Sequence, residues 1–322
     1  MTLGKLKLKV TDIQCEAKGI LLLELRDENK QALPPFTAGS HLEIYLANGL
    51  TRHYSLLNSP AERDRYVVAV SLDPNSQGGS AFFHQKIKLG DVLSISTPRN
   101  HFELVDVAEY CFIAGGIGIT PILSMIHWCI THQKKWTLYY STRNRQRAAF
   151  YESLNALHQA ENIHFHFNDE QANLLDLEHI VQELSPNTHI YCCGPNPLML
   201  ALKEVSVAIG ERVHFEWFNA PQPIKSETQS VEDISEFTVK LAKSGHEIIV
   251  KPEQSILDAI ESLGIEVPFS CRAGICGACE CTVLRGEPEH LDMVLSDSEK
   301  QANQRMVICV SRSRSPVLEL DL

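Results

Sequence analysis

The chain has 322 residues, of which 44% are hydrophobic and 21% are charged. This length exceeds that of an ordinary single domain, and the composition is typical of globular proteins, so we expect two or three domains. The formal net charge of −11 argues against binding to nucleic acid or to an anionic membrane surface, because contact with phosphate requires a basic surface.

The first segment, residues 1–104, is rich in short strand-like stretches that turn signals separate. Strands at this spacing predict an antiparallel β-barrel. The predicted strands cover residues 1–10, 21–26, 41–46, 51–57, 66–72 and 92–97, and one helix is predicted at residues 80–87. Residues 1–10 alternate apolar and charged side chains and lack a continuous apolar core, which favours a strand over a signal peptide.

The fourth of these strands contains the sequence RHYSL at residues 52–56. Arg52 offers a guanidinium fork for phosphate, Tyr54 a ring for stacking, and Ser55 a hydroxyl. Backbone donors for a second phosphate contact follow before the predicted helix, in Gly78, Gly79 and Ser80. Each feature alone is equally typical of an ordinary strand or loop, so their meaning depends on their occurring together.

The second segment, residues 105–220, alternates apolar strands with helical patterns. This alternation predicts a parallel sheet with helices on both faces. The predicted strands cover 110–115, 137–142, 163–167 and 189–195, and the predicted helices cover 121–131, 148–159, 177–184 and 197–210. The apolar stretch 110–130 is long enough to cross a membrane, but its glycines, proline and histidine favour a buried strand, turn and helix. We expect a cytoplasmic protein.

Three strands of this sheet end in polar or small residues. Gly115, Gly116 and Gly118 follow the first strand, where they would let a pyrophosphate approach a helix N-terminus, although they also suit a plain tight turn. Ser141 and Arg143 end the second strand and can reach a ribose or its phosphate, or simply begin a helix. Cys193 closes a later strand, at the edge where parallel sheets bind ligands, or is a buried core thiol. Gly194 and Pro195 follow it.

Residues 219–235 are polar with two prolines and predict a linker, for which we take residues 221–235. The third segment, residues 236–322, holds fourteen Asp and Glu against nine Lys and Arg. Its sequence predicts a hairpin at residues 237–250, a helix at 255–264, a cysteine-rich loop, and strands at 280–287 and 306–312.

The ten cysteines of the chain are unevenly placed, with four of them between residues 271 and 281. In a long chain without a predicted export signal, clustered cysteines indicate metal binding or catalysis rather than disulfides. The remaining six are Cys15, Cys111, Cys129, Cys192, Cys193 and Cys309.

The loop reads CRAGICGAC, with Cys271, Cys276 and Cys279, and Cys309 follows after 29 intervening residues on a predicted strand. This is the plant-type ferredoxin spacing for a 2Fe–2S cluster. Small residues in the loop would let backbone N–H groups turn toward the sulfurs and offset the charge of the cluster. A zinc site or buried structural thiols are the alternatives. Cys281 is left over, as a buried thiol or an alternative ligand.

Taken in order, RHYSL, GGS, GGIGITP, CCGP and CRAGICGAC with a later cysteine resemble the phthalate dioxygenase reductase family over essentially the whole chain. The resemblance implies a reductase component that passes electrons from NAD(P)H through FMN to a 2Fe–2S cluster and on to a Rieske-type oxygenase subunit. Carnitine monooxygenase is the first candidate system, with vanillate demethylase close behind. It implies an FMN-binding β-barrel at residues 1–104, an NAD(P)-binding α/β domain at 105–220 and a plant-type ferredoxin domain at 236–322.

The resemblance also implies residue roles, none of them acid or base. Arg52, Tyr54, Ser55, Gly78, Gly79 and Ser80 would hold FMN, and Thr120 would lie near its ring. Gly115, Gly116 and Gly118 would face the dinucleotide, Ser141 and Arg143 its adenosine half, and Cys193, Gly194 and Pro195 its nicotinamide. Phe218 would cover the flavin or else pack in the core. The metal ligands would be Cys271, Cys276, Cys279 and Cys309.

The chain departs from the family pattern near Leu72 and Gln77, where many relatives carry an arginine. Arg52 is then the main positive charge for the FMN phosphate. NADH is favoured, but Arg145 and Arg147 could meet a 2′-phosphate, so NADPH stays open. Two alternatives remain. A non-enzymatic electron carrier or redox sensor would hold no FMN. A self-contained reductase for a small acceptor would need no protein partner.

Overall fold

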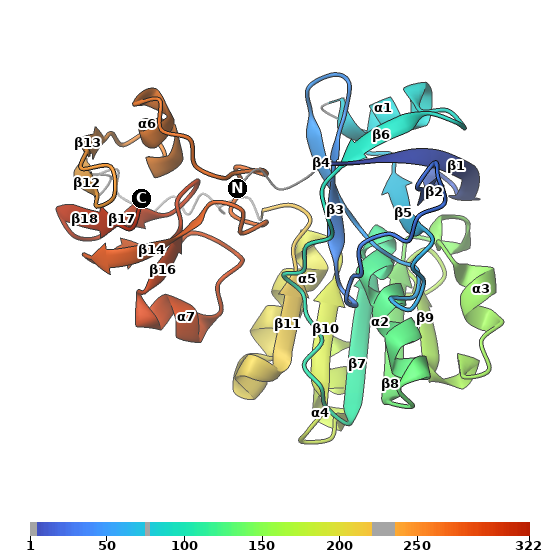
Figure 1. Cartoon of the computed structure of the whole chain (residues 1–322). Helices are drawn as coiled ribbons and strands as arrows, with labels where there is room; N and C mark the ends of the chain where they lie inside the picture. The colour runs from blue at the N-terminus through green and yellow to red at the C-terminus, as the bar shows by residue number, and fades with distance from the viewer. Residues whose placement is uncertain (1–4, 75–77, 221–235) are drawn as a thin grey trace. The chain divides into compact units, whose positions relative to one another are not determined.

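The computed structural model describes residues 5–74, 78–220 and 236–322. The chain divides into two compact units, Met1–Phe218 and Asn219–Leu322 (Figure 1). The predicted linker at 221–235 and the departure at Gln77 lie outside the described residues.

The first unit begins with a six-stranded antiparallel sheet in the order β4-β3-β6-β1-β2-β5. Its edge strands come together after β4, where the amide of Leu57 donates to the carbonyl of Val67 (3.1 Å), as closure of a barrel requires. The predicted barrel is therefore confirmed. Its strands are β1 (Leu6–Ala17), β2 (Ile20–Arg26), β3 (His41–Tyr45), β4 (Thr51–Ser55), β5 (Tyr66–Ser71) and β6 (Val92–Ile95).

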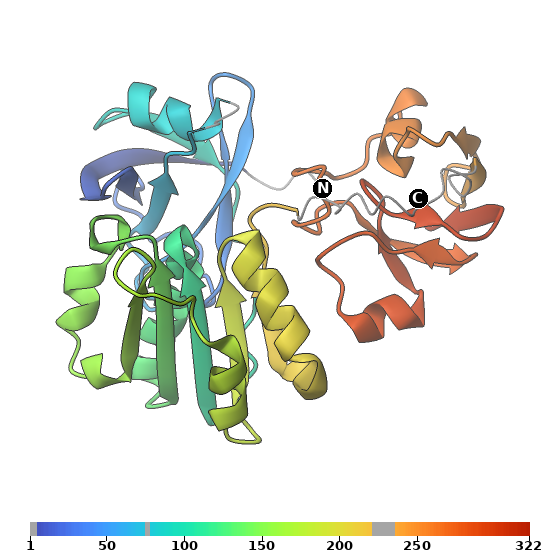
Figure 2. The ribbon, with the colours of Figure 1, turned by 180° about the vertical axis from the view of Figure 1, so that it is seen from behind.

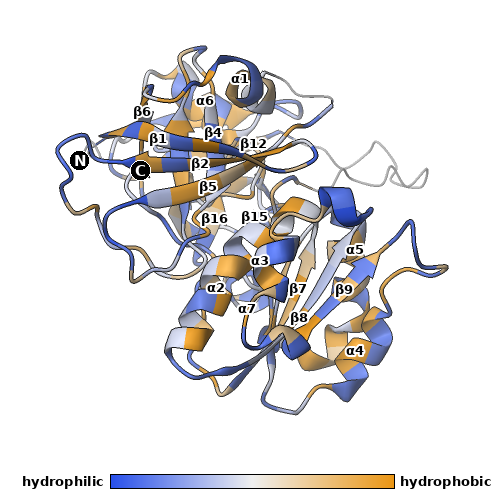
Figure 3. Ribbon diagram, turned by 90° about the vertical axis from the view of Figure 1, so that its right-hand side faces the viewer, coloured by the Kyte–Doolittle hydropathy of each residue, from blue (hydrophilic) through white to orange (hydrophobic). Residues whose placement is uncertain are grey.

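Alternation along these strands fills the barrel. On β2, Leu23 and Leu25 are buried in the core while Glu24 between them is partly exposed. Figure 3 shows orange and blue segments alternating along the strands of this sheet, as expected of strands that bury one face. The predicted helix is α1 (Gly79–Lys86), which contributes Phe83 to the same core.

The second sheet of this unit is fully parallel, in the order β11-β10-β7-β8-β9. Helix α2 covers one face, and α4 and α5 cover the other (Figures 1 and 2). The strands are β7 (Glu109–Gly115), β8 (Lys135–Thr142), β9 (Ile163–Phe167), β10 (His189–Cys193) and β11 (Val213–Glu216). The helices are α2 (Ile119–Thr131), α3 (Tyr151–Asn155), α4 (Leu177–Glu183) and α5 (Asn196–Val205).

The apolar stretch 110–130 forms β7, a short 3-10 turn η1 (Gly116–Gly118) and most of α2, as predicted. Within the described residues, no helix combines the length and the apolar character that crossing a membrane would need.

Three features of this sheet differ from the predictions. Helix α3 covers only five residues of the predicted 148–159, because Phe150 just before it adopts a left-handed conformation (φ 61°). Helix α5 stops at Val205, and the 3-10 segment η4 (Val207–Arg212) that follows contains a non-helical Gly210. Strand β11 was not predicted, because its four residues mix charged and apolar side chains.

The second unit is built on a five-stranded sheet in the order β13-β12-β18-β14-β16. The predicted hairpin is confirmed, with β12 antiparallel to β13, and the predicted helix is α6, capped by the hydroxyl of Ser255. The elements are β12 (Phe237–Leu241), β13 (Glu247–Val250), α6 (Ile256–Ser262), β14 (Glu280–Arg285), β15 (Pro288–Glu289), α7 (Asp297–Ala302), β16 (Arg305–Val307), β17 (Arg312–Ser313) and β18 (Val317–Leu320).

The prediction of a strand at 306–312 is wrong beyond Val307, where β16 ends. The chain turns after Val307, where the amides of Val310 and Ser311 both donate to the Val307 carbonyl. Cys309 therefore lies in a turn and not on a strand. It is next to the end of the cysteine loop, since the amide of Ile308 donates to the carbonyl of Cys279 (3.3 Å).

Candidate functional site

The carboxyl ends of β7 and β10 lie side by side, with Ala114 paired to Cys193. The turns that follow them pack backbone against backbone. A Cβ added to Gly118 would lie 2.2 Å from the Cys193 carbonyl oxygen, and one added to Gly115 would lie 2.4 Å from the Pro195 ring. These two glycines are therefore required by close packing of the two predicted turns.

Gly116 is the exception among these glycines. It has a φ of 53°, and a Cβ at this position would meet nothing within 4 Å. Its carbonyl accepts from the Tyr140 hydroxyl (3.1 Å), which fixes the turn from β8. The open face of this turn leaves room for a ligand at the edge where parallel sheets bind nucleotides.

The residues predicted to lie near the flavin ring or the nicotinamide divide into buried and partly exposed side chains. Cys193 is fully buried, and burial is the main reason that the pKa of its thiol is raised well above the ordinary value. Thr120 is also buried, and its hydroxyl donates to the Ile117 carbonyl (3.0 Å) at the start of α2. Phe218 is half-buried and packs against the core of the first unit, so part of its ring stays accessible.

Glu216 is a polar residue of this edge that the sequence reasoning missed. It ends β11, pairs in register with Cys193 on β10, and accepts a hydrogen bond from the Ser55 hydroxyl of the barrel (3.4 Å). Burial raises the pKa of the Glu216 carboxyl to about 8, although the bond from Ser55 opposes this shift. Ser55, Cys193 and Glu216 thus meet where the barrel joins the parallel sheet.

This raised pKa makes the stability of the first unit depend on pH. Between pH values of about 4.5 and about 8, the folded chain keeps the Glu216 proton that the unfolded chain has lost, so stability should fall as pH rises through this range. Glu216→Gln should remove this pH dependence. The change in unfolding free energy should be on the order of 2 kcal/mol, less than the full pKa shift implies, because solvent screens a half-buried side chain. Melting temperatures of both holoproteins across this range test this. Glu211→Gln, an exposed glutamate just before β11, is the control and should keep the wild-type slope.

The barrel supplies a second cradle, at the N-terminus of α1. A Cβ added to Gly79 would lie 2.3 Å from the Arg52 Nε atom, so Arg52 lies directly over the first turn of this helix. Gly78 caps the helix in a left-handed conformation (φ 89°), and the Ser80 hydroxyl accepts from the Asp73 amide (3.1 Å). A guanidinium placed over a helix N-terminus suits a phosphate.

Tyr54 lies next to this cradle on β4. Its ring packs edge-on against Phe83 of α1, with 5.0 Å between ring centroids, and it is half-buried. Its exposed part can stack against a planar ligand. Leu72, in the stretch where the family pattern places an arginine, is exposed.

The ends of β8 and β9 form the far side of the same edge. The Ser141 hydroxyl donates to the Asn168 side-chain oxygen (3.3 Å), and the Asp169 amide donates to the Arg143 carbonyl (2.9 Å). Arg143 itself is exposed. The structure therefore brings both predicted adenosine contacts to one place, beside a loop from β9 that was not predicted to take part.

In the second unit, the four predicted cluster ligands converge. The Cys271 thiol interacts with the thiols of Cys276 and Cys309, and the Cys279 thiol interacts with that of Cys309. The shared protons lower the pKa of Cys271 and raise that of Cys276. Cys271 is half-buried, and the other three are buried.

Backbone N–H groups point at these sulfurs. The amide of Ala273 donates to the Cys271 sulfur and that of Cys271 to the Cys276 sulfur, both at 3.4 Å. Further backbone donors to the thiols come from Ile275, Ala278 and Gly274. A loop that aims amides at four thiols fits an anionic iron–sulfur cluster, because these hydrogen bonds spread its charge.

Arg272 anchors this loop to α6. It has a left-handed φ of 52°, and its guanidinium donates to Asp258 (2.7 Å) and to both oxygens of Glu261 (2.7 and 2.8 Å). It also stacks on Phe269, 4.1 Å from the ring centroid. Cys281 lies outside the loop on β14, opposite Met306, and burial raises the pKa of its thiol to about 12.

Two other observations concern the described part of the chain. It contains no group of three or more His, Cys, Asp or Glu side chains set to hold a metal ion. A two-iron cluster differs in that each iron takes two of the four thiols.

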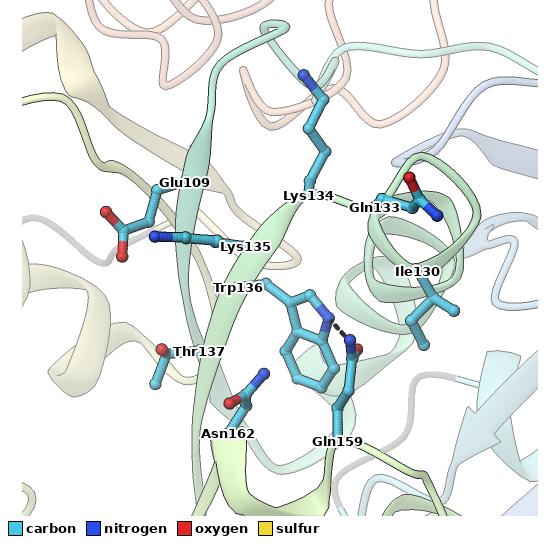
Figure 4. Close-up of a pocket in the computed structure, with 9 residues that line it drawn as sticks. All are labelled: Glu109, Ile130, Gln133, Lys134, Lys135, Trp136, Thr137, Gln159 and Asn162. Atoms are coloured by element: carbon cyan, nitrogen blue, oxygen red, sulfur yellow. Dashed lines mark hydrogen bonds between the residues drawn. The ribbon is translucent and has the colours of Figure 1, made fainter.

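A pocket of about 630 Å³ opens at the amino-terminal edge of the parallel sheet, beside Lys135 and Trp136 of β8 (Figure 4). It lies at the opposite end of the strands from the glycine-rich turn.

Comparison with known families supports the nucleotide edge of the first unit and, separately, the cysteine loop of the second unit. Residues 112–204 match the oxidoreductase NAD-binding domain, and residues 239–314 match the 2Fe-2S iron-sulfur cluster binding domain. The first range contains the glycine-rich turn and the CCGP turn, and the second contains all four cluster cysteines.

Several relatives align with nearly the whole chain. The chain is 42% identical to the phenoxybenzoate dioxygenase subunit beta of Ectopseudomonas oleovorans, over 100% of this chain and 98% of the relative. It is 40% identical to the carnitine monooxygenase reductase subunit of Escherichia coli strain K12, over 90% of both. It is 39% identical to the vanillate O-demethylase oxidoreductase of Acinetobacter baylyi, over 94% of both.

Solved structures agree with these relatives. The chain aligns with an intact type IV self-sufficient cytochrome P450 monooxygenase at a TM-score of 0.89 and 34% identity, over 99% of this chain but only 41% of that one. It aligns with phthalate dioxygenase reductase, described as a modular structure for electron transfer from pyridine nucleotides to 2Fe-2S, at a TM-score of 0.71 and 36% identity, over 99% and 98% of the two chains. The chain therefore belongs to the phthalate dioxygenase reductase family and is an NAD(P)H-dependent oxidoreductase with an iron–sulfur domain.

Proposed function

We propose that the chain is the reductase component of a two-component Rieske-type oxygenase, passing electrons from NADH through FMN to the 2Fe–2S cluster and on to the oxygenase. One observation carries this proposal. Ser55, on the same strand as Arg52, donates to Glu216, which pairs in register with Cys193, so the strand of the phosphate cradle contacts the nucleotide edge of the sheet. We propose the same three-part division as the sequence predicts, with the FMN domain at residues 1–104, the nucleotide domain at 105–220 and the ferredoxin domain at 236–322.

The residues of the cradle would hold FMN as follows. Arg52 and the amides at the start of α1 bind its phosphate, and the Tyr54 ring packs against its ring system. Ser55 and the neutral Glu216 carboxyl would offer hydrogen bonds to the flavin. Bound FMN supplies the conversion between two-electron and one-electron transfer, while the protein positions the donor and excludes water.

The role of Arg52 is testable through the FMN phosphate. Arg52→Gln should weaken FMN binding roughly tenfold to a hundredfold, because a hydrogen bond between charged groups is lost. Binding of riboflavin, which lacks the phosphate, should change little. Flavin fluorescence titration of the deflavinated protein measures both.

Lys86→Gln, at the opposite end of α1, is the matched control and should leave FMN affinity unchanged. Equal weakening of FMN and riboflavin by Arg52→Gln would show that Arg52 supports the fold and not the phosphate.

The partner is the finer part of the proposal. We propose carnitine monooxygenase as the first system to test and vanillate demethylase as the second, because relatives named for both align at similar identity. Reconstitution of the purified reductase with each oxygenase, followed by NADH consumption that depends on substrate, tests the choice. Turnover with carnitine alone supports the first system, and turnover with vanillate alone supports the second.

A carrier or redox sensor is the alternative from another class. It would bind the cluster through the same four thiols but would hold no flavin. FMN content of the purified protein separates the two, since the carrier alternative predicts no flavin even after FMN is added.

A further inference from the structure

Arg145, at the predicted adenosine end of the nucleotide edge, forms a bidentate ion pair with Glu170. Arg145 lies in the 3-10 turn η2 (Arg145–Arg147) just after β8. Its Nε and Nη2 atoms donate to both carboxylate oxygens of Glu170, at 2.9 to 3.2 Å. Its Nη1 atom donates to the Tyr151 hydroxyl (2.8 Å), and the guanidinium stacks on Phe167, 4.6 Å from the ring centroid.

Glu170 lies in the loop after β9, the strand next to β8. This loop is tied to the end of β8 by the backbone bond from Asp169 to Arg143 and by the side-chain bond from Asn144 to Asp169 (2.9 Å). Two carboxylates, Asp169 and Glu170, therefore stand beside the predicted ribose contacts at Ser141 and Arg143. A carboxylate at this position accepts a ribose 2′-hydroxyl and repels a 2′-phosphate.

We propose that Glu170 is a specificity-determining residue that makes the chain select NADH over NADPH. It does so by holding the Arg145 guanidinium in a bidentate pair, so that this cation is withheld from a 2′-phosphate, which then meets the negative charge of Asp169. Arg143 and Arg147 are exposed and have no side-chain partner among the described residues, so they are open to the parts common to both dinucleotides. The inference rests on the proposed function, since it takes a nicotinamide dinucleotide as electron donor.

The test compares reduction of the bound flavin by NADH and by NADPH, in the anaerobic holoprotein, as second-order rates in stopped flow. Wild type should react faster with NADH. Glu170→Gln should raise the ratio of the NADPH rate to the NADH rate roughly tenfold or more, because it releases Arg145 for a charge-assisted bond to the phosphate. Glu161→Gln, an exposed carboxyl at the amino-terminal side of β9, carries the same charge change and should leave the ratio unchanged.

A second pair of variants separates release of Arg145 from simple loss of charge. Arg145→Ala alone should leave the ratio within about twofold, because the wild-type guanidinium does not reach the dinucleotide. In the Glu170→Gln background, Arg145→Ala should remove most of the gain.

Three outcomes would overturn the proposal: equal wild-type rates with both dinucleotides, no change in ratio for Glu170→Gln, or an Arg145→Ala loss of NADPH reduction in the wild-type background. These differ from failure of the proposed function, in which neither dinucleotide reduces the wild-type flavin.

Discussion

Replacing Cys276 by serine should remove the iron–sulfur cluster and leave reduction of the flavin by NADH intact. The Cys276 sulfur receives the Cys271 amide and interacts with the Cys271 thiol, so it belongs to the converging set. A serine hydroxyl is a poor ligand for a cluster that thiolates hold. Iron and sulfide per chain should fall from about two of each to a small fraction. Flavin reduction should persist because its residues all belong to the first unit.

Cys281→Ser is the matched control, since Cys281 is the one other cysteine near the loop and lies on β14 outside the converging thiols. It should keep the cluster at wild-type content. Loss of iron in Cys281→Ser together with retention in Cys276→Ser would show that the ligand set is wrong.

Gly118→Ala should destabilise the first unit by about 3 kcal/mol or more and weaken binding of the dinucleotide. Gly118 has ordinary helical dihedrals, so the cost is steric: the added methyl would lie 2.2 Å from the Cys193 carbonyl oxygen and 2.8 Å from the Gly194 amide nitrogen. Backbone atoms on both turns would have to separate. Thermal unfolding followed by circular dichroism, and titration with NAD⁺, measure the two effects.

Gly116→Ala provides the comparison from the same turn. Its methyl meets no atom within 4 Å, and the cost is only the left-handed φ of 53°, about 1 to 2 kcal/mol. Equal destabilisation by the two variants would show that the two turns do not need to pack backbone to backbone.

Local patterns predicted most of the fold. The strands of the barrel, the β7–turn–α2 unit and the hairpin of the second unit follow from alternation and turn residues, and all are present. The cysteine spacing predicted which four thiols converge, because three of them lie in one short loop. The predicted position of Cys309 on a strand was wrong. Strand β16 ends at Val307, where the carbonyl accepts hydrogen bonds from two later amides and forms a turn, which the periodicity of the sequence does not reveal.

What the sequence did not reveal depends on contacts between distant residues. Glu216 lies 161 residues from Ser55, and only the packing of the barrel on the sheet brings them together. Its one local signal was a carboxyl within the otherwise largely apolar HFEWF. Arg145 was predicted as a candidate for a 2′-phosphate, but its pairing with Glu170, 25 residues later, becomes visible only when β8 and β9 lie side by side.

The most direct measurement is the absorption spectrum of the purified protein before and after stoichiometric NADH under anaerobic conditions. The account predicts flavin and iron–sulfur bands together, both bleached by NADH, because the cradle at Arg52 and the thiols of the second unit each hold their cofactor. Iron–sulfur absorbance without flavin after FMN is added, or flavin that NADH does not bleach, would contradict it.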